Sequence, residues 1–108
     1  MKTKQLTFLL ALTFLFLFSG SVYGDDFQDG LDAHKRKDYK EAFKWWSLSA
    51  EQGYAEAQFN LGLMYADGLG VAKDYAEAIK WLKLAAEQKF EAAQFQLETM
   101  HFNENILN

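Results

Sequence analysis

Apolar side chains recur at helical spacing through most of this chain. Between residues 38 and 52 they follow the i, i+3, i+4, i+7 pattern, which places them on one side of an α-helix; the stripe is Tyr39, Ala42, Phe43, Trp46 and Ala50. A second stripe of this kind is Ala57, Leu61, Met64 and Tyr65. The sequence contains no proline, and no stretch alternates with period two. The pattern predicts five helices and no sheet, at about 26–36, 38–52, 55–66, 74–88 and 90–102.

The predicted helix ends carry recognisable signals. Asp38 and Glu41 stand three residues apart before one stripe, as in a capping box, and Asp74 precedes the equivalent helix in the same way. Gly53 follows the helix 38–52 at a point where a left-handed residue is often needed. Lys89 occupies the equivalent place later in the chain, and a left-handed conformation there costs roughly 1 kcal/mol more than for glycine.

The chain repeats itself with a period of 36 residues. Residues 37–45 fall on 73–81, the triplet from Ala50 falls on that from Ala86, and the triplet from Ala57 falls on that from Ala93. Sixteen of the 29 positions from 37 to 65 are identical to their partners. A period in the range of about 20–50 residues indicates one supersecondary unit stacked on copies of itself. Each unit reads as two antiparallel helices, so the fold class predicted is an all-α solenoid.

The first 24 residues differ from the rest. Lys2 and Lys4 precede an apolar run over 6–18, and small residues follow over 19–24. This is the layout of a secretory signal peptide, and the apolar run is shorter than the ~20 residues that a spanning helix needs. We expect cleavage after Gly24, with Ser21 as the alternative site and an uncleaved anchor as the alternative role. The protein is therefore predicted to be secreted or periplasmic.

Composition narrows the classes of partner. Without residues 1–24 the chain has 84 residues (108 − 24), with 9 basic (11 − 2) and 15 acidic side chains, a net charge of −6. Such a surface argues against nucleic acid and against docking on anionic lipid after signal removal. Cysteine is absent, so disulfides and thiolate metal sites are excluded.

Residues 55–88 closely resemble one whole Sel-1-like repeat (SLR), from a branch of the tetratricopeptide superfamily. The small and aromatic positions that match are Ala57, Leu61, Gly62, Tyr65, Gly68, Gly70, Val71, Ala78, Trp81 and Ala85. The resemblance implies a tetratricopeptide/SLR-type α-solenoid of about two and a half helix pairs, with units at about 26–53, 54–89 and 90–108. It further implies a scaffold that binds proteins.

The third unit departs from the pattern. It has Glu98 where the second unit has Gly62, and His101 where the second has Tyr65. Residues 102–108 are either a closing helix with a polar outer face, which solenoids need at their ends, or the relic of a longer array.

Candidate catalytic residues are few. The two histidines, His34 and His101, lie in different units and have no neighbouring ligands. Acidic residues recur at the repeat period, which is typical of caps and solvent-exposed faces, and Ser47 and Ser49 have no histidine nearby. We therefore predict no enzyme activity, no metal and no cofactor, and a hydrolase is the least favoured reading.

The first helix of each unit is the better candidate for binding, because helical repeats use their concave surface for partners. In this chain the predicted contact residues lie off the buried stripes of these helices: Glu56, Phe59, Asn60, Leu63, Phe95 and Gln96. An apolar strip with a polar rim suits a peptide or helix. The alternative for Phe59 and Phe95 is that they pack between units. We predict a non-catalytic adaptor or scaffold, with a self-associating structural repeat as the alternative.

Overall fold

The computed structural model describes residues 25–107, and it describes side chains as far as residue 103. This part of the chain forms five helices and no strand, which confirms the predicted fold class. The signal peptide predicted for residues 1–24 lies outside the described residues. The helices are an N-terminal helix over 25–35, α2 (Tyr39–Glu51), α3 (Ala55–Asp67), α4 (Tyr75–Glu87) and α5 (Glu91–Leu107).

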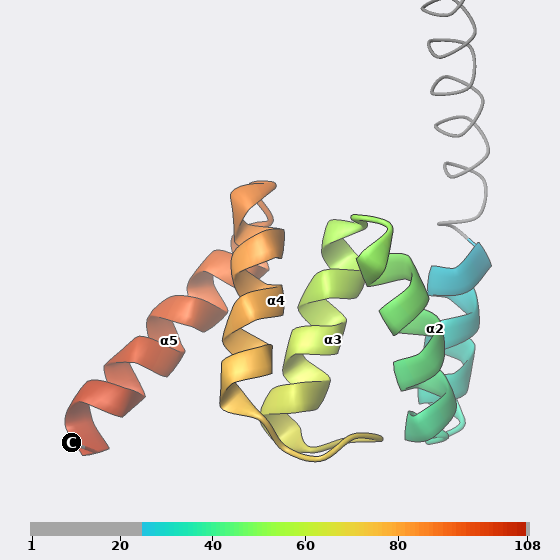
Figure 1. The fold of residues 1–108 in the computed structure, drawn as a ribbon, viewed down its shortest axis with the longest axis horizontal. Helices are drawn as coiled ribbons and strands as arrows, with labels where there is room; N and C mark the ends of the chain where they lie inside the picture. Colours follow the sequence, from blue (N-terminus) through green and yellow to red (C-terminus); the bar gives the residue numbers. More distant parts are fainter. Residues whose placement is uncertain (1–24, 108) are drawn as a thin grey trace, which may run out of the picture.

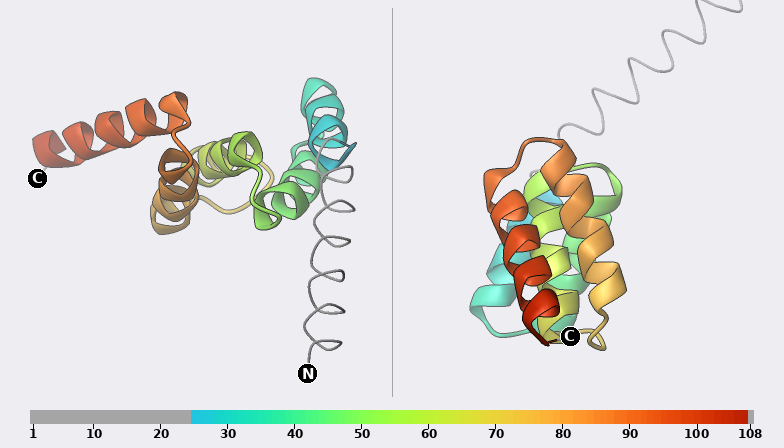
Figure 2. Two further views of the ribbon diagram at one scale, coloured as in Figure 1. Left: turned by 90° about the horizontal axis from the view of Figure 1, so that it is seen from above. Right: turned by 90° about the vertical axis from the view of Figure 1, so that its left-hand side faces the viewer.

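Consecutive helices run antiparallel and stack side by side (Figure 1). Helix α3 packs against both α2 and α4, and α4 packs against α5. Seen from above, the helix over 25–35, α3 and α5 form one layer, whereas α2 and α4 form the other (Figure 2). The first layer curves inward at α3, so its outer surface is the concave side of the solenoid.

The helix ends follow the predicted signals. The carboxylate of Asp38 accepts a hydrogen bond from the backbone N–H of Glu41 at 3.3 Å, and the carboxylate of Asp74 accepts the equivalent bond at 3.1 Å. Gly53 (φ 98°) and Lys89 (φ 64°) are both left-handed, as expected from their equivalent positions. Lys37 adopts the same conformation (φ 63°), which sequence analysis did not predict.

Helix α5 continues to Leu107, beyond the end predicted near residue 102. In the second unit, Gly68 ends α3 and Gly70 lies in the loop that leads to α4; both glycines have positive φ. The positions one period later hold Glu104 and Ile106. Because neither residue favours a left-handed turn, nothing at these positions stops the helix.

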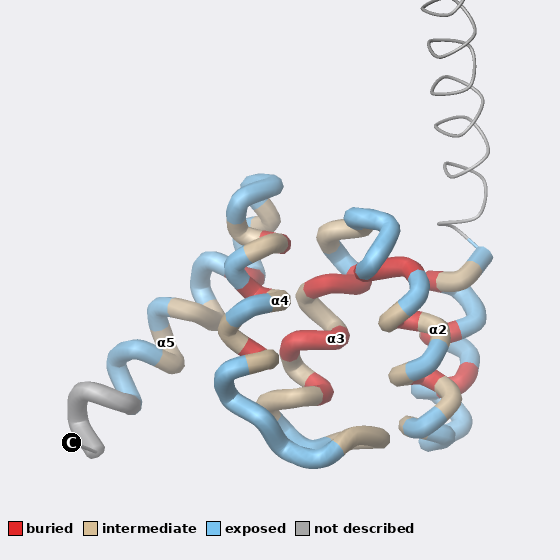
Figure 3. Tube along the Cα trace, in the orientation of Figure 1, coloured by how far each residue is buried: buried red, intermediate tan, exposed pale blue. Residues whose placement is uncertain are grey.

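Two apolar clusters hold the units together. Between the first and second units the cluster includes Ala33, Trp46 and Leu61, and between the second and third it comprises Leu82, Ala85 and Ala93. The buried part of the chain therefore centres on α3, whereas α5 is mostly exposed or half-buried (Figure 3).

Small residues allow the closest helix approaches. Gly62 faces α4 so closely that a Cβ there would lie 2.8 Å from Leu82 Cγ. Gly30 similarly faces the indole of Trp46, whose N–H donates to the backbone carbonyl of Phe27 at 3.2 Å.

Glutamine side chains add polar links between units. The Gln58 amide donates to the buried carbonyl of Ala50 at 3.2 Å. The Gln88 amide, at the end of α4, donates to the Gly53 carbonyl and to Gln58 Oε1, both at 2.9 Å. The two Gln88 bonds join residues 35 and 30 positions apart, so they tie the end of α4 to the turn between α2 and α3 and to α3 itself.

Candidate protein-interaction surface

The described residues show no grouping suited to metal chemistry. No set of three or more His, Asp or Glu side chains over this range could hold a metal ion. His34 instead packs between aromatic rings, with its centroid 5.4 Å from those of both Tyr39 and Trp46. His101 lies on α5, two units away. The two histidines therefore do not form a common site.

Among the described helices, none combines the length and the apolar character needed to cross a membrane.

Helix α3 places three of the predicted contact residues on the concave side. It buries Ala57, Gln58, Leu61, Gly62 and Met64. Glu56, Asn60 and Leu63 lie on its other side, where Glu56 is exposed and Asn60 and Leu63 are half-buried. Leu63 belongs to neither apolar cluster of the described residues. Because Leu63 is only half-buried, part of its side chain remains accessible to another molecule. We call Glu56, Asn60 and Leu63 the inner strip.

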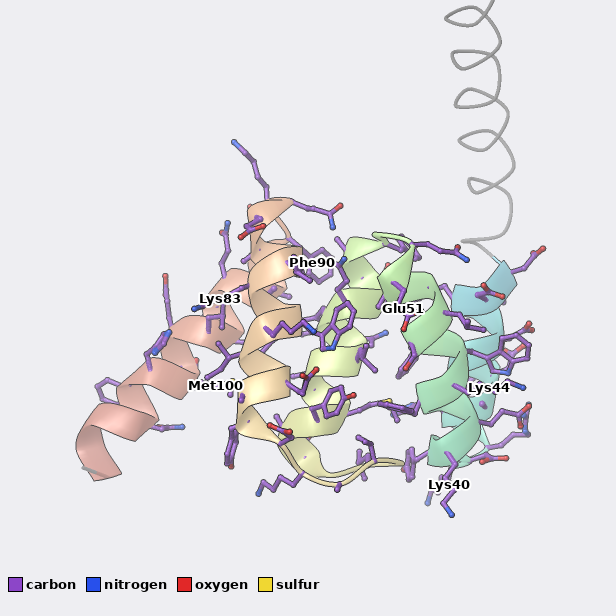
Figure 4. The ribbon with its side chains drawn as sticks, viewed as in Figure 1. Lys40, Lys44, Glu51, Lys83, Phe90 and Met100 are labelled. Carbon is purple, nitrogen blue, oxygen red and sulfur yellow. The ribbon has the colours of Figure 1, made fainter. Side chains whose placement is uncertain are left out.

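Phe59 packs between units. Its ring centroid lies 5.4 Å from that of Phe90, and it joins the cluster around Leu82 and Ala93. Figure 4 shows Phe90 between the upper ends of α3 and α4. Sequence analysis gave Phe59 two possible roles, contact with a partner or packing between units. The structure shows the second, packing between units.

Phe95 has a different environment from its repeat partner. Its side chain is 70% exposed on α5, and the next residue, Gln96, is half-buried. Since the ring partner of Phe59 is Phe90, the structure does not join Phe59 and Phe95 into one apolar strip.

Sequence analysis missed a second exposed aromatic residue on α5. Phe102 is 64% exposed and stands seven residues after Phe95, so both lie on the same side of the helix. Glu91 and Glu98 complete the i, i+4, i+7, i+11 series and are also exposed. The helical spacing of these four residues was the signal available in the sequence. We call them the α5 stripe.

Acidic residues also concentrate at the other end of the array. The helix over 25–35 exposes Asp25, Asp29 and Asp32. Partial burial raises the pKa of Asp26 above its ordinary value, and the negative charges of Asp29 and Asp25 raise it further. The helix over 25–35 carries four aspartates against one lysine, Lys35, a net charge of −3 (4 − 1), so its surface is polar and anionic.

The stacked hairpins and their concave layer define a helical-repeat solenoid. The Sel1 repeat family model matches residues 23–54 and 55–90, together more than half of the chain. The chain therefore belongs to the Sel1 repeat family. Proteins of this family generally mediate protein–protein interactions, and their fold is typically a non-catalytic interaction module.

Solved structures agree with this assignment. The chain is similar to a protective antigen of uropathogenic Escherichia coli strains that displays an SLR fold, with a TM-score of 0.73 and 34% identity over 76% of this chain. It is also similar to a Sel1 repeat protein from Oxalobacter formigenes, with a TM-score of 0.57 and 39% identity over 57% of this chain. The match spans 18% of the length of each of these proteins. A search of curated proteins found no match.

Proposed function

We propose that this chain is an exported, non-catalytic adaptor that binds a peptide or helix of another protein on its concave side. The observation that carries the proposal is Leu63, a half-buried leucine on the concave side of α3 that belongs to neither core cluster. Glu56 and Asn60 flank it with a carboxylate and an amide, so an apolar anchor and hydrogen-bonding groups lie together. Helical peptides use such a combination when they dock in a groove.

Export rests on the N-terminal sequence. Two lysines, an apolar run over 6–18 and small residues before Asp25 favour a secretory signal, and the absence of cysteine is compatible with an oxidising compartment. The proposed location is the periplasm or the cell exterior. Mass determination of the protein recovered from cells tests this directly, because removal of residues 1–24 leaves Asp25 as the first residue.

Capture of partners tests the binding surface. The chain, tagged at its C-terminus, would be cross-linked in its native extract beside a Leu63→Glu variant. Leu48→Glu is the matched control, since Leu48 is 40% exposed on α2, in the other layer of helices. We expect a protein retained by the parent and by Leu48→Glu but lost with Leu63→Glu.

Circular dichroism checks that both variants keep their helix content. If Leu63→Glu retains every partner that the parent captures, the inner strip is not the binding surface and the proposal is wrong.

A further inference from the structure

The α5 stripe is an accessible surface of alternating acidic and aromatic side chains. Glu91, Phe95, Glu98 and Phe102 lie on one side of α5, and all four are exposed. The opposite side of the helix packs through Ala93, Leu97 and Met100; Figure 4 labels Met100, which lies between α5 and α4. Two phenylalanines with 70% and 64% of their surface in water form an apolar patch that no described part of the chain covers.

The repeat makes clear what does not fit on this stripe. In the second unit, α4 approaches α3 at Gly62, where a Cβ would lie 2.8 Å from Leu82 Cγ and 3.2 Å from the Ala78 carbonyl. Glu98 occupies the equivalent position on α5. A helix that approached α5 as closely as α4 approaches α3 would collide with the Glu98 side chain. An occupant of the stripe must therefore lie farther from the α5 backbone than α4 lies from that of α3.

The charge of the α5 stripe then decides whether a second copy of the chain could bind there. The sequence of α5 contains glutamate but no lysine or arginine. Two copies that meet through α5 would bury Glu91 and Glu98 of both copies with no lysine or arginine of α5 to pair with them. The helix over 25–35 at the opposite end exposes Asp25, Asp29 and Asp32 against one exposed lysine, Lys35, so head-to-tail contact through this helix also joins predominantly like charges. Like charges across an interface disfavour pairing, so a second copy of the chain is a poor partner.

A basic amphipathic helix satisfies both features of the stripe. Its apolar side chains would cover Phe95 and Phe102, and lysine or arginine beside them would pair with Glu91 and Glu98. Arginine would also gain from lying over the face of an aromatic ring. We propose that the α5 stripe is a docking surface for a cationic amphipathic helix of another protein. This inference rests on the proposed function, since it assumes that the chain binds proteins, but it uses a surface separate from the inner strip.

A designed peptide pair tests the inference. The probe is a synthetic amphipathic helix with leucine along one face and lysine on both borders, and its control has glutamate in place of each lysine. The protein is expressed from the complete sequence and used in the form that cells accumulate. Anisotropy of the labelled peptides measures affinity. We expect the lysine peptide to bind, and to bind more weakly at high salt because screening reduces the attraction between opposite charges.

Paired substitutions locate the site. Phe95→Ala with Phe102→Ala is expected to weaken binding about tenfold or more, because buried aromatic anchors dominate such interfaces. Glu91→Gln with Glu98→Gln is expected to weaken binding about threefold to tenfold and to flatten the salt dependence. Glu51→Gln with Glu87→Gln is the control, because it makes the same charge change at exposed positions of α2 and α4 and should leave binding unchanged.

Several results would overturn the inference. Equal binding of the glutamate peptide, or unchanged binding by the Phe95→Ala, Phe102→Ala variant, excludes a cationic partner at this stripe. A dimer in sedimentation experiments that is lost with the same variant would identify a second copy as the occupant instead. If Leu63→Glu abolishes peptide binding while the α5 variants retain it, the proposed function stands and this inference falls.

Discussion

Replacement of Gly62 by alanine is expected to lower the free energy of unfolding by about 1 kcal/mol. In an open helix the same change raises stability by about 1 kcal/mol, because alanine has the higher helix propensity. Here the new Cβ would lie 2.8 Å from Leu82 Cγ and 3.2 Å from the Ala78 carbonyl oxygen. Leu82 is fully buried and the carbonyl is backbone, so the contact is relieved only if α3 and α4 separate. Overpacking of this kind costs about 1–3 kcal/mol, which outweighs the propensity gain.

Urea unfolding followed by circular dichroism measures this change. A loss of about 1 kcal/mol corresponds to a melting temperature lower by about 4–8 °C for a domain of this size. In a Leu82→Ala background the clash with Cγ is gone and only the 3.2 Å contact with the Ala78 carbonyl remains, so Gly62→Ala should cost less than in the parent or become neutral. Glu98→Ala, at the equivalent exposed position of α5, should change stability by no more than about 0.5 kcal/mol. If Gly62→Ala stabilises the parent protein, α3 and α4 do not approach as closely as described.

Two further predictions concern backbone conformation and pH. Lys89 is left-handed (φ 64°), so Lys89→Gly should raise the melting temperature by an amount equivalent to roughly 0.5–1 kcal/mol. Gly53→Lys should lower the melting temperature for the same reason. If Lys89→Gly brings no gain, the left-handed conformation of Lys89 does not cost the protein stability. Burial, followed by the charges of Glu77 and Asp74, raises the pKa of Tyr65 above its ordinary value of 10.0. The unfolded tyrosine then ionises first, so this contribution to stability is complete below pH 10.0 and is lost as the pH rises through the folded pKa. Tyr65→Phe should flatten the fall in urea midpoint at alkaline pH, and an unchanged profile would refute this role.

Local features of the fold were predictable because they depend on short stretches of sequence. The apolar stripes located the helices, Asp38 and Asp74 located two helix starts, and the match between Gly53 and Lys89 located two left-handed turns. The length of α5 was missed because a polar run over 103–105 interrupts its apolar spacing before the helix ends. Its continuation depends on the missing glycines at positions 104 and 106, which only a comparison with Gly68 and Gly70 makes visible.

The binding surfaces were less predictable because they depend on which surfaces of a unit are covered by its neighbours. Phe59 and Phe95 occupy equivalent repeat positions, yet Phe59 contacts Phe90 and Phe95 faces water. Sequence identity between repeats cannot distinguish an internal unit from one whose outer side is open. The bond from the Gln88 amide to the Gly53 carbonyl was missed for a related reason, since it requires the relative placement of two units rather than the pattern within one.

The nearest-neighbour arrangement of the helices has a consequence for how the protein folds and opens. Helix α3 has partners on both sides, α2 and α4, whereas the helix over 25–35 and α5 stand at the two ends of the described array. Contacts between helices adjacent in sequence keep the contact order low, which favours rapid folding. Opening should begin at α5 and at residues 25–35, and the amides of α3 should exchange their hydrogens most slowly. The inner strip thus lies on the most persistent helix, and the α5 stripe lies on one of the first to loosen.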